Sequence, residues 1–87
     1  GLGKNIPIEV ETRNLEEVKE AIQIGGNEIQ VIMLDNMSLE MMEEAVRLIA
    51  GRYKTEASGG ITLEKLPAIA ACGVDFISMG ALTHSAK

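Results

Sequence analysis

The chain has 87 residues, which is enough for one domain at most, and a domain of this size has a thin core. Apolar residues make up 46% of the chain but aromatic residues only 2%, and 13 acidic residues against 8 basic ones give a net charge of −5. Because a nucleic-acid backbone requires clustered Lys and Arg, this acidic balance predicts no nucleic-acid partner.

The sequence contains one cysteine and no segment typical of export or membrane insertion. Cys72 has no second cysteine to pair with, and no Cys/His spacing suggests a zinc site. There is neither a charged leader before a stretch of ~15 apolar residues nor a run of about 18 apolar residues, so we expect no membrane partner and a cytoplasmic location. Because the chain begins at Gly1 without an initiator Met, we also expect it to be part of a longer protein.

Strand-like and helix-like segments alternate along the chain. The predicted order is a strand at 6–12, a helix after Asn14, a strand at 30–35, a helix after Ser38, a strand at 53–58, a helix after Thr62 and a strand at 75–80. The three residues that precede the helices lie 24 residues apart, which is an internal repeat, and Asn14 with Glu17 approximates a capping box. The alternation predicts parallel strands joined by right-handed crossovers.

Repeating units of this kind predict an α/β fold, either about half of a TIM-like (β/α)₈ barrel or a small open doubly wound sheet. One face of the predicted sheet is polar, since Glu9 and Glu11 alternate with Ile8 and Val10. A parallel sheet covered on both sides should be apolar on both faces, whereas a barrel lumen tolerates charge near its C-terminal rim. We therefore favour a parallel βαβαβαβ segment of a barrel, with residues 1–87 as one partial barrel domain.

Two carboxylates fall at the predicted strand ends. Glu11 and Asp35 each precede a helix-starting residue by three positions, so they share a phase of the repeat. The ends of neighbouring parallel strands lie roughly 5 Å apart, where two negative charges repel unless a cation or hydroxyl donors separate them. We interpret the pair as a ligand site; the alternative is that they are ordinary rim residues in caps or surface ion pairs.

Glycine turns follow the last two predicted strands. Ser58, Gly59 and Gly60 precede the third helix, and Gly80 and Ala81 follow the fourth strand. Free amide N–H groups in such turns bind phosphate, and many barrels carry a phosphate site after their last two strands. An ordinary turn is the alternative for either of them alone.

The remaining polar candidates have simpler interpretations. Lys54 and Glu56 fit a structural ion pair, and His84 fits a loop histidine because no catalytic or metal-ligand partner accompanies it. The five methionines, Met79 included, fit core positions.

Four strings of the sequence, IEVET, VIMLDNMS, TEASGGITLEKL and GVDFISMGALTHSAK, together resemble the second half of quinolinate phosphoribosyltransferases. The resemblance covers nearly the whole chain, with a slightly longer link at residues 25–30. It implies an incomplete α/β barrel that follows an N-terminal α+β domain. It also implies an enzyme of NAD biosynthesis that joins quinolinate to phosphoribosyl pyrophosphate with Mg²⁺, releasing pyrophosphate and CO₂ and forming nicotinate mononucleotide.

The resemblance further implies roles for individual residues. Glu11 and Asp35 would be catalytic, holding the ribose hydroxyls and Mg²⁺, directly or indirectly, and favouring the cationic sugar that develops as pyrophosphate leaves. The sugar phosphate would be bound through the backbone of Ser58, Gly59, Gly60, Met79, Gly80 and Ala81. Glu56 and His84 match positions near that site, without a role that the resemblance assigns.

The basic residues with which this family binds quinolinate have no equivalent here. They come from earlier strands and from the partner subunit, so we expect the isolated chain to be inactive and the parent enzyme to be a homo-oligomer. Two alternatives stay open: another phosphate-binding barrel, such as a thiamine-phosphate or tryptophan-pathway enzyme, and a non-catalytic half-barrel scaffold. We expect the isolated chain to self-associate because its edge strands, 6–12 and 75–80, would be unpaired.

Overall fold

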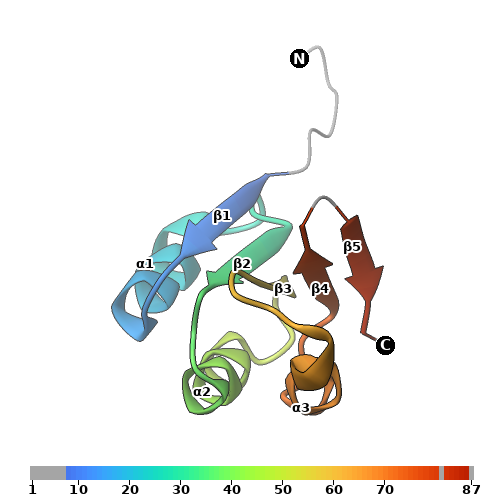
Figure 1. Ribbon diagram of the computed structural model, residues 1–87. Coiled ribbons are helices and arrows are strands. Elements are labelled where there is room, and N and C mark those ends of the chain that lie inside the picture. Colours follow the sequence, from blue (N-terminus) through green and yellow to red (C-terminus); the bar gives the residue numbers. More distant parts are fainter. Residues whose placement is uncertain (1–7, 81, 87) are drawn as a thin grey trace.

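A computed structural model describes residues 8–80 and 82–86 and arranges them as one sheet with helices packed against it (Figure 1). The strands are β1 (Glu9–Thr12), β2 (Val31–Asp35), β3 (Lys54–Ser58), β4 (Phe76–Met79) and β5 (Leu82–Ser85). The helices are α1 (Leu15–Gly25), α2 (Leu39–Ile49) and α3 (Leu66–Ala71), with a 3₁₀ turn, η1 (Leu63–Lys65), before the last. None of the helices in this part of the chain is long and apolar enough to cross a bilayer.

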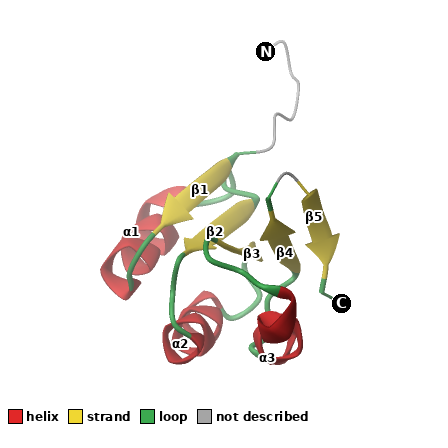
Figure 2. Ribbon diagram, in the orientation of Figure 1, coloured by secondary structure: helices red, strands yellow, loops and turns green. Residues whose placement is uncertain are grey.

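The strand order separates the two predicted architectures. The strands lie in the order β1-β2-β3-β4-β5, and the first four are parallel (Figure 2). Right-handed crossovers between consecutive neighbouring strands put every helix on the same face, as in a barrel, whereas a doubly wound sheet requires the order to reverse. The fold is therefore a parallel α/β segment of a barrel, as the polar face of the predicted sheet suggested.

The fourth parallel strand is not an edge, contrary to our expectation. Strand β5 pairs with β4 in antiparallel orientation, with Met79 beside Leu82 and Phe76 beside Ser85. The hairpin satisfies the backbone groups of β4 that were expected to be free, so the exposed edge on this side moves to β5. Residues 6 and 7 of the first predicted strand lie outside the described residues.

The two faces of the sheet differ in composition. The face under the helices is buried and almost wholly aliphatic, and it includes Ile32, Leu34, Ala57 and Ile77. The opposite face is partly open and bears the acidic residues of β1 and the polar end of β3. The polar candidate residues therefore lie on the second face, which corresponds to the lumen of a barrel.

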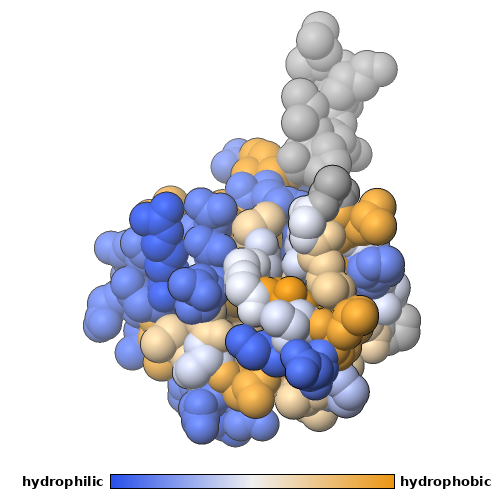
Figure 3. Space-filling view, in the orientation of Figure 1, coloured by the Kyte–Doolittle hydropathy of each residue, from blue (hydrophilic) through white to orange (hydrophobic). Residues whose placement is uncertain are grey.

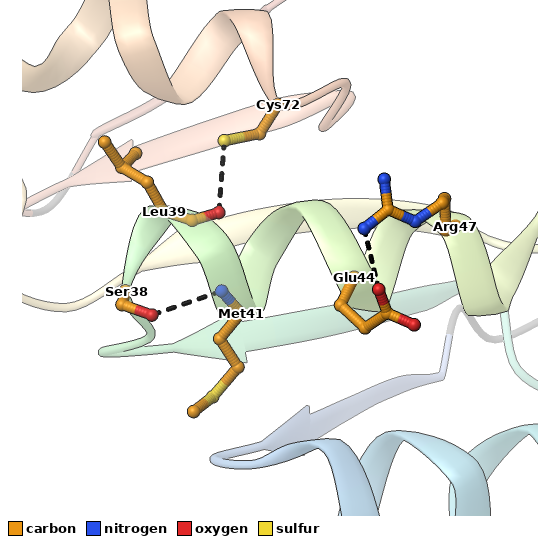
Figure 4. Close-up of polar contacts among 6 residues, drawn as sticks. All are labelled: Ser38, Leu39, Met41, Glu44, Arg47 and Cys72. Atoms are coloured by element: carbon orange, nitrogen blue, oxygen red, sulfur yellow. Dashed lines mark hydrogen bonds and ion pairs between the residues drawn. The ribbon is translucent and has the colours of Figure 1, made fainter.

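Side-chain caps start the first two helices at the predicted residues. Asn14 accepts a hydrogen bond from the backbone N–H of Glu17 at 2.9 Å, and the Glu17 carboxylate accepts one from the N–H of Arg13 at 2.7 Å. Ser38 accepts from the N–H of Met41 at 3.1 Å (Figure 4). These bonds satisfy amide donors that have no partner within the helix.

The third predicted cap is wrong. Thr62 makes no side-chain cap bond, and the chain winds through η1 before α3 begins at Leu66. Pro67 explains the difference, because it has no N–H to donate to residue 63 and so an α-helical first turn lacks its bond there. As a result α3 has 6 residues, against 11 in each of the other two helices.

We expect the caps to differ in energy accordingly. Asn14→Ala should lower the free energy of unfolding by about 1 kcal/mol, whereas Thr62→Ala should change it by less than about 0.5 kcal/mol. Urea denaturation followed by circular dichroism measures both. Equal losses in the two variants would contradict the assignment of the caps.

Candidate functional site

The candidate residues gather at the C-terminal ends of the parallel strands. Asp35 is the last residue of β2 and pairs with Ser58, the last residue of β3. Glu11 pairs with Met33 and therefore lies on the same face as Asp35 but two residues earlier along the strand direction. The two carboxylates are thus diagonal neighbours, about 8 Å apart at their Cα atoms rather than level with each other as we expected.

The position level with Asp35 on the first strand belongs to Arg13. Its Nε lies 3.8 Å from Oδ2 of Asp35, with the Asp35 side chain 27% exposed and that of Arg13 71% exposed. We expected a cation or hydroxyl donors between Glu11 and Asp35, whereas the structure places Arg13 beside Asp35. For Asp35 this contact is the surface ion pair of the alternative interpretation. The spacing of the helix caps predicts that Glu11 pairs with Asp35, and that register differs from the observed one by two residues.

The two glycine turns line one cavity, as predicted. It has a volume of about 320 Å³, and its walls are Ser58, Gly59, Gly60, Ile61, Ser78, Met79 and Gly80. Ala81, the remaining predicted member, lies outside the described residues. The cavity lies at the C-terminal ends of β3 and β4, and Ser58 and Ser78 contribute hydroxyl groups to its walls.

Gly59 connects this cavity to the carboxylate of the neighbouring strand. Its φ is +82°, and a Cβ there would lie 2.6 Å from Oδ1 of Asp35 and 3.0 Å from the backbone N of Asn36. The N–H of Asn36 also donates a hydrogen bond of 2.7 Å to the carbonyl of Ser58. The turn after β2 and the turn after β3 therefore form one packed unit that only glycine at position 59 permits.

Glu56 lies deeper on the same face and is not ion-paired with Lys54, so that prediction is wrong. Lys54 is exposed, whereas Glu56 is 6% exposed. Burial raises the pKa of the Glu56 carboxyl, and the charge of Glu9 and a hydrogen bond with it raise that pKa further. A proton is therefore retained on this carboxyl to a higher pH than on an ordinary glutamate.

His84 and the methionines complete the predicted set. His84 is an exposed residue of β5, paired with Ile77, rather than a loop residue. Met37 and Met42 are in the core as expected, and Met79 lines the cavity.

The carboxylates present suit a metal ion that arrives with its ligand. The described ranges contain no group of three or more His, Cys, Asp or Glu side chains that would hold an ion alone. Mg²⁺ is commonly bound through one or two carboxylates together with substrate phosphates and water. Glu11 and Asp35 share one face of the sheet, with Asp35 next to the glycine cavity, and they could contribute oxygens to such a shared site.

Comparison with known proteins gives a consistent result. A family model described as quinolinate phosphoribosyl transferase, C-terminal domain, matches residues 1–87. The chloroplastic carboxylating nicotinate-nucleotide pyrophosphorylase of Arabidopsis thaliana is 51% identical over 92% of the chain and 26% of its own length. A probable enzyme of the same name from Bacillus subtilis is 47% identical over 98% of the chain and 28% of its own length.

The same likeness appears among solved structures. The nicotinate-nucleotide pyrophosphorylase of Francisella tularensis superimposes with a TM-score of 0.79 at 42% sequence identity, over 92% of this chain and 28% of that one. The chain thus spans about a quarter of the length of the relatives that it matches.

Proposed function

Because this chain belongs to the quinolinate phosphoribosyltransferase family, we propose that it supplies the phosphoribose-binding part of an enzyme that joins quinolinate to phosphoribosyl pyrophosphate. The products would be nicotinate mononucleotide, pyrophosphate and CO₂. Membership of this family decides against the thiamine-phosphate and tryptophan-pathway barrels as alternatives.

One observation carries the proposal: a cavity lined by glycine turns lies directly beside a carboxylate on the polar face of the sheet. The phosphate of the sugar would bind the amides and hydroxyls of the cavity, with Ser58 and Ser78 among its walls. Asp35 packs against Gly59 at the edge of that cavity. The ribose ring would therefore extend from the cavity toward β2.

Glu11 and Asp35 would act on the sugar itself. Their oxygens accept hydrogen bonds from ribose hydroxyls, and fixed negative charge stabilises the cationic sugar that forms as pyrophosphate departs. Mg²⁺, when bound, would neutralise the phosphates of the substrate and orient them. Glu56 would contribute less negative charge to the site than an exposed glutamate does, because burial raises the pKa of its carboxyl.

Quinolinate would be held by other parts of the enzyme. Among the charged side chains on the open sheet face of the described chain, carboxylates outnumber cations, and carboxylates repel a dicarboxylate. We therefore propose that residues 1–87 form one partial barrel domain, that this chain is inactive by itself, and that the functional enzyme is a cytoplasmic homo-oligomer. Self-association of the isolated chain stays a prediction.

Calorimetry with ribose 5-phosphate and Mg²⁺ tests the site. We expect Glu11→Gln to weaken binding about three- to tenfold, because a neutral amide accepts hydroxyl hydrogen bonds less strongly than a carboxylate. Glu20→Gln is the matched control, since Glu20 is an exposed carboxylate on α1. Equal affinities in the wild type and both variants would remove Glu11 from the site, and no binding by the wild type would favour a non-catalytic scaffold.

A further inference from the structure

Arg13 is a charged side chain at the rim to which the sequence argument gave no role. Its backbone N–H is held by Glu17 and its Nε lies near Asp35, but its two terminal nitrogens make no hydrogen bond within the described residues. The side chain is 71% exposed. Its guanidinium therefore lies beside Asp35 at the rim, with terminal N–H donors available to a ligand.

The order of groups along the rim matches the order of groups in the substrate. From β4 toward β1 the rim presents the glycine cavity, then Asp35, then Arg13. Phosphoribosyl pyrophosphate has its 5-phosphate at one end, the ribose in the middle and the 1-pyrophosphate at the other end. With the 5-phosphate in the cavity and the ribose beside Asp35, the pyrophosphate reaches the end of β1.

We propose that Arg13 binds the 1-pyrophosphate of the substrate, an inference that rests on the proposed function of the site. The other cation beside these turns, Lys65, donates to the carbonyl of Gly60 at 3.3 Å and so lies on the 5-phosphate side. Within the described part of the rim, Arg13 is the cation on the β1 side. The carboxylate of Asp35, 3.8 Å from Nε, favours a guanidinium position at this end of the rim.

The chemistry of the leaving group explains the choice of arginine. When the bond between C1 of the ribose and the pyrophosphate oxygen breaks, both electrons pass to that oxygen, and the departing group gains negative charge. Arg13 remains protonated throughout, so no proton has to be transferred. A planar guanidinium donates two parallel hydrogen bonds to a phosphate, which a lysine ammonium cannot reproduce.

A comparison of two ligands separates this role from a general effect of charge. We expect Arg13→Gln to weaken binding of phosphoribosyl pyrophosphate with Mg²⁺ about tenfold at low salt, as for one charge-assisted contact, while ribose 5-phosphate, which lacks the pyrophosphate, changes less than about twofold. Arg13→Lys should fall between the wild type and Arg13→Gln. Raising the ionic strength should reduce the difference, because exposed charges are screened.

Arg52→Gln serves as the control for net charge. Arg52 is an exposed arginine at the opposite ends of the strands, 5.9 Å above the ring of Tyr53, and its loss should change neither affinity. An Arg13→Gln variant that loses both ligands equally, loses neither, or binds phosphoribosyl pyrophosphate more tightly because Asp35 is freed for Mg²⁺ would overturn the proposal. Failure of the wild type to bind ribose 5-phosphate would instead contradict the proposed function on which it rests.

Discussion

Replacement of Gly59 by alanine is expected to abolish measurable binding of ribose 5-phosphate and to lower the free energy of unfolding by about 2–4 kcal/mol. The backbone at this position is left-handed, with φ +82°, which alone disfavours any residue with a Cβ. In addition, the Cβ would meet the carboxylate of Asp35 at 2.6 Å and the backbone of Asn36 at 3.0 Å. The carboxylate can rotate away, but the backbone of the neighbouring turn cannot, so the cavity itself would be distorted.

Gly51 offers a closely matched control for this substitution. Its φ is +79°, and a Cβ there would find no atom within 4 Å. Gly51→Ala should therefore cost only about 1–2 kcal/mol from the strained backbone and leave ligand binding unchanged. Urea denaturation and calorimetry give both quantities for each variant. If Gly51→Ala and Gly59→Ala destabilise the protein equally and both still bind, the contact between Gly59 and Asp35 has no importance for the site.

Glu56→Gln is expected to stabilise the protein at pH 7 by about 1 kcal/mol, the lower end of the cost of an incompletely compensated buried polar group. Burial, and then Glu9, raise the pKa of this carboxyl above its ordinary value of 4.5. Between pH 4.5 and the raised pKa, the folded state keeps a proton on Glu56 that the unfolded state has released. The contribution of Glu56 to the free energy of unfolding is therefore fully present below pH 4.5 and is lost as the pH rises through the raised pKa.

The measurement is the difference in unfolding free energy between Glu56→Gln and the wild type from pH 4 to pH 8. At pH 4 the two proteins should have nearly the same free energy of unfolding. As the pH increases, the Glu56→Gln variant should become progressively more stable than the wild type. Glu28→Gln, which changes an exposed loop residue, should follow the wild type at every pH. A constant difference between Glu56→Gln and the wild type across this range would show that the buried carboxyl does not titrate abnormally.

The order of the parallel strands and the positions of the first two helices could be predicted because their signals are local. Asn14 and Ser38 are caps that act within one helical turn, and alternation of side chains marks the two faces of each strand. The antiparallel strand β5 could not be predicted. All four of its residues are exposed and carry no alternating pattern, and its backbone pairs with the edge that β4 would otherwise leave open.

The grouping of the candidate residues at one edge of the sheet could be predicted from the sequence, but the register between the strands could not. Matched strand ends correctly brought Ser58 and its glycines near Gly80 and on the same face as Asp35. The offset of Glu11 and the place of Arg13 depend on where β1 ends relative to α1, and cap spacing does not define that point. The contact of Asn36 with the glycine turn likewise depends on its left-handed backbone, with φ 58°, which no sequence pattern marked.

Because α3 is short, the region around it should open locally more readily than the rest of the molecule. A cavity of about 550 Å³ lies between this helix and the β4–β5 hairpin, with Leu66 and Ile77 among its walls. Leu63 is 73% exposed and Leu82 64% exposed, and Figure 3 shows more apolar surface over this side than over α1. Local opening should therefore begin around α3 and the hairpin, while the centre formed by β2, β3 and α2 keeps its amide hydrogens protected until the whole chain unfolds.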